Sequence, residues 1–172
     1  KRAMRKTLDE VAAEAAIRDL QRLYCRGVDR LDWDMVRSIF QDDADLDYGF
    51  MRGGPDEFVA MAREGLLTYS GTTHFIGNQL VEVAPDGLSA WAEHYVVAWH
   101  RCPADADGPE RDFVCWFRYA DRNECRDGDW RISARVLLVD RWRVDPVGEA
   151  GEGPTTRRGA RGGDDLSFAI RA

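Results

Sequence analysis

The sequence predicts a single domain of the α+β class, with helices in its first part and a sheet in the rest. Apolar residues recur at helical spacing from Val11 to Leu66, and from Thr72 onward they alternate with a period of two. In such a fold we expect a curved sheet to wrap around the helices and leave a pocket between them. The 172 residues, 44% of them hydrophobic, are enough for one core.

The helical spacing predicts three helices, over residues 7–29, 33–40 and 55–66, with a short strand at 44–48 before the last. Thr7 and Glu10 have the spacing of a capping box at the start of the first helix. Asp32 is a suitable cap for the second helix, and Pro55 stands where the third can begin.

After Thr72 the alternation predicts four strands, over residues 74–83, 90–101, 111–124 and 130–142. Asp86-Gly87 and Asp127-Gly128 are the Asp-Gly pairs typical of hairpin turns, and Pro103–Pro109 is a longer polar loop. Strands joined in this way run antiparallel.

The composition changes after Val144, where glycine becomes frequent and apolar residues become rare. We therefore divide the chain into a domain of residues 1–144 and a Gly-rich tail of residues 145–172. The apolar segment Leu166–Ile170 could dock as a short strand or lid, or it could be a frayed terminus.

Charge and hydropathy exclude several kinds of partner. The net charge is −7 and no long run of Lys or Arg occurs, which speaks against nucleic acid and anionic lipid as partners. No segment approaches the ~20 apolar residues of a membrane helix, and the basic N-terminus lacks an apolar signal core. We expect no membrane association and a soluble, cytoplasmic protein. The four cysteines are isolated along the chain and are expected to be reduced packing thiols.

The end of the first helix carries a candidate catalytic carboxylate. Tyr24 and Asp29 lie there about one and a half turns apart. If this end projects into a pocket, the carboxylate of Asp29 is partly withdrawn from water, which makes a carboxylate a stronger base. The alternative is a helix-terminal carboxylate paired with Arg26 or Arg30.

His74 is the candidate proton carrier. On an extended strand His74, Ile76 and Asn78 point to one face, which then carries an imidazole and an amide. Histidine can relay a proton at neutral pH, and an acidic neighbour would fix its tautomer. The alternative is a histidine packed in the core or at its rim.

Two more histidines, His94 and His100, share a face of the next strand. They would stand ~20 Å apart, too far to share a metal ion, and they match no metal-binding motif. We therefore expect no metal. The sequence also lacks the nucleotide-binding and nucleophile motifs, and we expect no cofactor.

Arg135 lies between apolar residues on the last strand. It shares a face with Ser133 and Leu137, while Ile132 is expected on the opposite face. An arginine in such surroundings needs a partner, either a core carboxylate or a bound anion or carbonyl group.

Three segments together resemble the SnoaL-like group of the nuclear-transport-factor-2-like superfamily. They are the helix AAIRDLQRLYCRGVDRLDWD, the strand DYGF with a helix after Gly-Pro, and the strand THFIGNQLVEV. The resemblance covers about residues 8–142. It implies a cone-shaped, cystatin-like fold, with three or four N-terminal helices packed on a curved, mostly antiparallel mixed sheet that encloses a pocket.

The group contains scytalone dehydratase, hexachlorocyclohexane dehydrochlorinase and bile-acid 7α-dehydratase. In these enzymes a helix aspartate and a strand histidine abstract the proton, and they match Asp29 and His74 here. The resemblance implies that Tyr24 and Arg135 assist catalysis. It implies a substrate-binding role for Tyr48, Asn78 and His94.

The resemblance thus implies a cofactor-free lyase of the dehydratase type that acts on an apolar cyclic or steroid-like molecule. An isomerase or a polyketide-type cyclase could use the same dyad. A non-catalytic subunit or binding module, like the small subunit of ring-hydroxylating dioxygenases, is the alternative of another class. The resemblance also implies a homo-oligomer, a trimer, with a dimer as the alternative.

Overall fold

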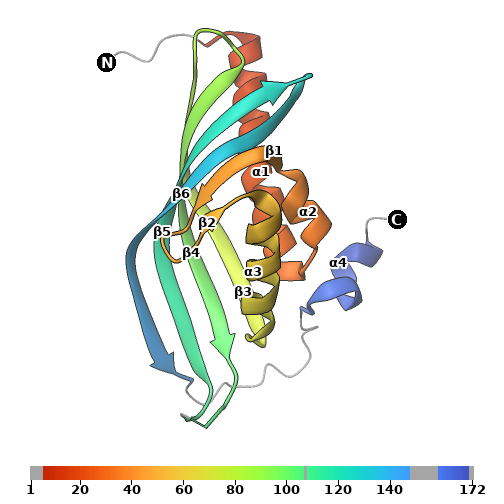
Figure 1. Cartoon of the computed structure of the whole chain (residues 1–172). Helices are drawn as coiled ribbons and strands as arrows, with labels where there is room; N and C mark the ends of the chain where they lie inside the picture. The colour runs from red at the N-terminus through yellow and green to blue at the C-terminus, as the bar shows by residue number, and fades with distance from the viewer. Residues whose placement is uncertain (1–5, 107, 148–158, 171–172) are drawn as a thin grey trace.

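The computed structural model describes residues 6–106, 108–147 and 159–170. These residues form four α-helices and a six-stranded, mixed sheet. The sheet is curved and does not close, and helices α1, α2 and α3 lie against one of its faces (Figure 1). The predicted α+β class is confirmed.

The helices begin at the residues that their caps predict. Helix α1 (Leu8–Arg30) starts with a capping box between Thr7 and Glu10, and α2 (Trp33–Ser38) starts with Asp32, whose side chain accepts from the Met35 amide. Helix α3 (Pro55–Leu67) has proline in its first turn. The expected extension of α2 through Phe40 is wrong, because Phe40 already begins the first strand.

The sheet has the strand order β2-β1-β6-β5-β4-β3. The strands are β1 (Phe40–Asp47), β2 (Arg52–Gly53), β3 (Gly71–Val83), β4 (Ser89–Cys102), β5 (Arg111–Arg126) and β6 (Asp129–Pro146). Neighbours are antiparallel except for β1 and β6, which run parallel. The four long strands follow the prediction, although each is longer by a few residues, and the two-residue strand β2 was not expected.

Register shifts change which side chains face the helices. In β3 the pairing with β4 shifts between Ile76 and Gln79, so Asn78 leaves the face of His74 and is exposed. In β6 a second shift, opposite Arg122 and Asn123, brings Ile132 to the buried side together with Arg135. Both corrections have one cause, since a bulge adds a residue and inverts the alternation beyond it.

The crossing of α1 and α2 depends on Gly27. A Cβ atom at this position would lie 2.6 Å from Cγ2 of Val36 and 3.2 Å from the carbonyl oxygen of Asp32. Helix α1 therefore ends close against α2, and Leu31 closes it with a left-handed conformation (φ 57°). This packing fixes the last turn of α1, which carries Asp29.

The C-terminal segment ends in a short helix, α4 (Leu166–Ala169), where a strand or lid was one expectation. Helix α4 lies beside the other helices and away from the sheet (Figure 1). Strand β6 continues two residues beyond the expected domain end at Val144. The remaining part of the predicted tail, residues 148–158 and 171–172, lies outside the described residues, as does the basic N-terminus, residues 1–5.

Among the helices of the described part of the chain, none is long and apolar enough to cross a membrane.

Candidate active site

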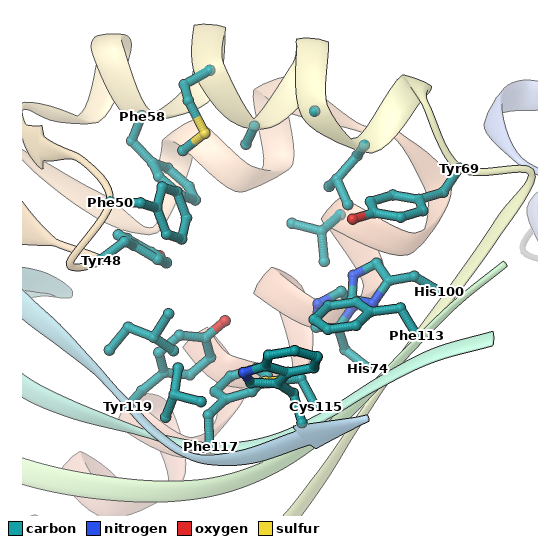
Figure 2. A pocket seen from close by; sticks show the side chains of 18 of the residues that line it. Tyr48, Phe50, Phe58, Tyr69, His74, His100, Phe113, Cys115, Phe117 and Tyr119 are labelled. Atoms are coloured by element: carbon teal, nitrogen blue, oxygen red, sulfur yellow. The ribbon is translucent and has the colours of Figure 1, made fainter. Parts of the chain in front are cut away.

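A cavity of about 480 Å³ lies between α3 and the inner face of the sheet (Figure 2). Its walls are mostly apolar and aromatic, which together with its size suits a small organic molecule. The polar side chains in its wall are few: Tyr24, Tyr48, Thr68, Tyr69, His74, His100 and Tyr119. They gather near the two ends of the cavity.

At one end the structure brings Asp29 and His74 together. His74 Nδ1 lies 2.8 Å from Asp29 Oδ1, and the backbone amide of His74 donates to Asp29 Oδ2 at 2.9 Å. The side chain of Asp29 is 12% exposed and that of His74 is 8% exposed. The carboxylate is thus held by the histidine and its backbone.

The expected alternative for Asp29 is not what the structure shows. Arg30 Nη1 donates to the backbone carbonyl of Asp29, while Arg26 donates to the hydroxyl of Ser167. Neither arginine forms an ion pair with the carboxylate within the described residues. The carboxylate is therefore available to act on His74.

The geometry sets the tautomer of His74. An ionised carboxylate only accepts hydrogen bonds, so the proton of the neutral ring resides on Nδ1, and Nε2 keeps its lone pair. His74 lines the cavity. The arrangement can therefore accept a proton from a molecule in the cavity at Nε2.

His100, which the sequence analysis did not select for a role, lies next to His74. The two ring centroids are 5.4 Å apart, and Tyr69 and Phe113 pack on His100 with centroids at 4.7 and 5.5 Å. Burial, followed by the nearby His74, lowers the pKa of His100 to about 4, so the ring is neutral at pH 7. The β3–β4 hairpin could have indicated that His100 lies near His74, because its pairing places His100 opposite Thr72, and Thr72 is two residues before His74 on β3.

Three tyrosine hydroxyls meet at the other end of the cavity. Tyr24 and Tyr48 lie 3.3 Å apart through their hydroxyls, and Tyr119 donates to Tyr24 at 3.3 Å. Burial raises the pKa of each phenol well above its usual value, so all three stay protonated at neutral pH. Tyr24 and Tyr48 were predicted. Tyr119 was missed, although the inward alternation of β5 with Cys115 and Phe117 could have indicated it.

Arg135 lies behind this tyrosine group and does not line the cavity. Its guanidinium is fully buried, forms two hydrogen bonds to Asp121 at 2.8 and 2.7 Å, and donates to Gln21 at 2.8 Å. It also packs 3.9 Å from the ring centroid of Tyr119 and 4.7 Å from that of Tyr24. Of the two partners that the sequence allowed, the structure contains the core carboxylate. Arg135 can act on the cavity through the tyrosines.

Asn78 and His94 do not reach the cavity. His94 is fully buried, with Nε2 3.7 Å from Asp121 and Nδ1 3.1 Å from the amide of Gln79. Burial lowers its pKa to about 4. Asn78 lies on the outer face of the sheet in a small groove, turned there by the bulge in β3. Their expected substrate-binding roles therefore find no support in this geometry.

The described side chains favour neither metal-binding nor thiol chemistry at this site. In the parts of the chain that the structure describes, no three His, Cys, Asp or Glu side chains are arranged to hold a metal ion. The four cysteines are free thiols. Burial, and then the charge of Asp29, raises the pKa of Cys25 to about 12, so this thiol is poorly suited to act as a nucleophile.

Comparison with solved structures identifies the same fold in several proteins. A type 2 hexachlorocyclohexane dehydrochlorinase (LinA) superposes with a TM-score of 0.74 at 24% identity, over 85% of this chain and 98% of the other. A scytalone dehydratase-like protein from Novosphingobium aromaticivorans gives 0.70 at 20% identity, over 83% and 98%. A protein assigned as the β subunit of an aromatic-ring-hydroxylating dioxygenase from the same organism gives 0.61 at 20% identity, over 80% and 99%.

These superpositions establish the fold, and identities of 20–24% establish no more than the fold. The named proteins include both lyases and a dioxygenase subunit. A search of curated proteins gave no match. The SnoaL-like domain matches residues 9–136, which span α1 through the first part of β6 and include every residue of the cavity described above except three at its β6 edge. The chain therefore belongs to the SnoaL-like domain family of nuclear-transport-factor-2-like folds.

Proposed function

We propose that the protein is a cofactor-free lyase that removes water, or a similar leaving group, from an apolar cyclic or steroid-like small molecule. The observation that supports this proposal most strongly is the 2.8 Å contact between His74 and Asp29 in the wall of an apolar cavity. A base that is oriented by a carboxylate and faces a dry cavity is the arrangement that proton abstraction from carbon needs.

In this proposal Asp29 holds His74 with its Nε2 lone pair toward the cavity. Nε2 removes a proton from a carbon atom of the bound molecule, and Asp29 stabilises the imidazolium that forms. The electron pair of the broken C–H bond forms the new double bond as the bond to the leaving hydroxyl breaks, and the imidazolium returns its proton to that hydroxyl, which departs as water. His100 stays neutral beside it, so this second ring adds no positive charge that would oppose the step. General base catalysis of this kind contributes ~10²–10⁴-fold to the rate.

The tyrosine group gives the proposed substrate its second feature. Two of the three phenol protons are used in the hydrogen bonds among Tyr24, Tyr48 and Tyr119, so one remains to donate to an oxygen of the substrate, where it would stabilise negative charge as an enolate develops. Arg135 supports them from behind as a buried positive charge. The suited substrate is therefore apolar, with a carbonyl oxygen at the tyrosine end that is conjugated to the carbon from which His74 removes the proton.

The test is a turnover screen of hydroxylated steroids and polycyclic hydroxyketones, with product identification by mass spectrometry. We expect loss of water from at least one compound, and a rate reduced by ~10²–10⁴-fold in His74→Ala and Asp29→Asn. Asn78→Ala, on the outer face, is the matched control and should retain the wild-type rate. Activity that survives in His74→Ala would exclude the dyad as the base.

Isomerisation and polyketide-type cyclisation begin with the same proton abstraction, so the same screen separates them. A product of unchanged mass indicates an isomerase or an aldol-type cyclase, and NMR of the product distinguishes a shifted double bond or stereocentre from a new ring. Both would keep the dependence on His74.

A non-catalytic subunit is the candidate of another class, favoured by the likeness to the dioxygenase β subunit. It predicts stable association with a larger subunit and no turnover by the isolated chain. Affinity purification from the native cell distinguishes the two. The dyad in the cavity wall favours the enzyme.

We also propose that the chain assembles with copies of itself, as a trimer. The face of the sheet away from the helices exposes large apolar side chains, including Phe75 (68%), Trp91 (42%) and Tyr95 (45%). Light scattering coupled to size-exclusion chromatography tests this. A monomer at micromolar concentration would contradict it.

A further inference from the structure

The C-terminal segment, residues 159–170, is attached to the helices around the dyad although it does not line the cavity. Its anchors on α1 lie on both sides of Asp29. Asp165 forms an ion pair with Arg30 at 3.5 Å, and Ser167 accepts from both terminal nitrogens of Arg26 at 3.4 Å. The ring of Phe168 packs 4.7 Å from the guanidinium of Arg26.

A third anchor, Arg161, connects the segment to the end of α3. Its Nη1 donates to the carbonyl oxygens of Leu66 at 3.0 Å and Tyr69 at 2.6 Å. The last carbonyls of a helix have no partner inside the helix, and a guanidinium is well suited to satisfy them. Leu66 and Tyr69 both line the cavity, and the Tyr69 ring lies against His100.

The charge of Arg161 acts on the catalytic end of the cavity. Burial lowers the pKa of Arg161, while the nearby charge of Asp29 acts to raise this pKa and that of Arg30 to lower it. Its Nε and Nη2 atoms are buried and have no hydrogen-bond partner among the described residues. No ion pair within the described residues neutralises the guanidinium of Arg161. Its positive charge therefore acts on the groups around it.

We propose that Arg161 is a positioning residue of the Asp29–His74 site: it holds Tyr69 against His100 and places a fixed positive charge beside the dyad. The contacts and the charge of Arg161 do not depend on the proposed function, while their effect on turnover rests on it. Docking of the C-terminal segment then completes the site from behind the cavity wall instead of covering the opening.

His100 reports on both parts of the proposal. The groups that act on it are Asp29 from α1, His74 from β3, Tyr69 from the α3–β3 connection, Phe113 from β5 and Arg161 from the C-terminal segment. Burial is the main reason for its low pKa, and Arg161 contributes in the same direction. Removal of the charge of Arg161 should therefore make His100 easier to protonate.

Hydrogen exchange tests the contact with α3. In Arg161→Gln we expect the amides of the α3 end, residues 66–70, to exchange about tenfold faster, as loss of a charge-assisted hydrogen bond implies. The matched control is Arg126→Gln, which removes an arginine paired with Asp43 and Glu124 away from the cavity and should leave this segment unchanged. Phe168→Ala, which weakens an anchor and keeps Arg161, should give a smaller increase.

Imidazole NMR tests the charge, because the chain has three histidines and His94 is an internal standard. The charged groups that influence His94 are Asp121, Arg135 and Arg18, without Arg161. In Arg161→Gln the titration midpoint of His100 should rise by about half a pH unit while that of His94 stays constant. Arg161→Lys keeps the charge and should leave the midpoint of His100 near that of the wild type.

Unchanged exchange at the α3 end in Arg161→Gln would overturn the positioning role. An unchanged His100 midpoint, an equal shift of His94, or the same shift in Arg161→Lys would overturn the role of the charge. None of these measurements needs a substrate, so failure of the proposed reaction is distinguishable from failure of this inference. With an active compound in hand, Arg161→Gln should lower kcat more than it changes KM.

Discussion

The molecule contains two groups of polar side chains that the fold treats differently. One is the cavity wall with the Asp29–His74 pair, in which His74 lines the cavity and Asp29 is hydrogen-bonded to it. The other is a buried polar cluster behind the wall, formed by Gln21, His94, Asp121 and Arg135. Every member of the cluster is at most 1% exposed, and Arg135 is paired there with Asp121 and Gln21, although its Nη1 atom has no hydrogen-bond partner among the described residues.

The difference shows why polar residues of similar type have different roles in the two groups. In the cavity wall, both carboxylate oxygens of Asp29 contact His74, one at the backbone amide and one at Nδ1. These contacts within the described residues leave Nε2 of His74 available to a ligand. In the cluster, Asp121 accepts two hydrogen bonds from Arg135, and the cation packs on the rings of Tyr24 and Tyr119. Substitutions in the wall should affect function, and substitutions in the cluster should affect stability.

The largest expected effect separates the two groups by stability. Arg135→Leu leaves Asp121 as an unpaired buried charge and should lower the free energy of unfolding by ~3–5 kcal/mol. His74→Ala, at the cavity surface, should cost only about 1 kcal/mol through its hydrogen bond. Urea denaturation followed by tryptophan fluorescence measures both. Equal losses would remove the distinction.

The second expected effect is loss of stability in mild acid. His94 and His100 have a pKa of about 4 in the folded protein because burial disfavours the charged ring, against 6.5 in the unfolded chain. The unfolded state binds protons first, so stability is constant above pH 6.5 and falls as the pH decreases toward 4, by up to ~3 kcal/mol per histidine. Urea titrations at pH 7, 5.5 and 4.5 measure this. Constant stability across that window would contradict the burial of the two rings.

A ligand sharpens the same comparison, since only one of these histidines lines the cavity. An apolar molecule that fills the cavity should change the titration of His100 and leave that of His94 unchanged. Imidazole NMR with and without the ligand distinguishes them.

The third prediction concerns the helix crossing that carries Asp29. Gly27→Ala would place a methyl group 2.6 Å from Val36 and should lower the free energy of unfolding by ~1–3 kcal/mol. The matched control is Gly65→Ala in α3, where nothing lies within 4 Å and the better helix former should be neutral or stabilising by up to ~1 kcal/mol. Thermal unfolding of both variants checks the difference. A Gly27→Ala protein as stable as the control would show that the crossing tolerates a wider spacing.

The smallest effect is expected at Asn78. Its side chain is exposed on the outer face, so Asn78→Ala should change the free energy of unfolding by less than ~0.5 kcal/mol. Ligand binding in the cavity should also stay the same, as isothermal titration with any compound found in the screen would show. Weakened binding would restore the role that the sequence analysis assigned to it.

The sequence predicted the elements of the fold well because caps, periodicity and turns are local signals. Thr7, Asp32 and Pro55 mark helix starts as expected, and Asp127-Gly128 forms the two-residue turn with positive φ at both residues (54° and 91°). The β-bulges were beyond such rules, because an inserted residue is fixed by the partner strand and leaves no local pattern.

The site was predicted in part for the same reason. Asp29 and His74 lie close together as the family resemblance implied, with catalysis still to be tested. His100, Tyr119 and Arg161 were missed, because their positions in the site depend on strand register and on a segment about 90 residues away from α3 along the chain. Conversely, His94 was assigned to the pocket although a buried carboxylate accounts for its position.

The central claim is that Asp29 holds His74 as a base directed into the cavity, and ¹⁵N NMR of the His74 ring tests it most directly. The account predicts a ring that is protonated at Nδ1 and unprotonated at Nε2 at pH 8, and a redistribution between the two nitrogens in Asp29→Asn. A ring that carries its proton on Nε2 in the wild type, or that is unaffected by Asp29→Asn, would contradict the account.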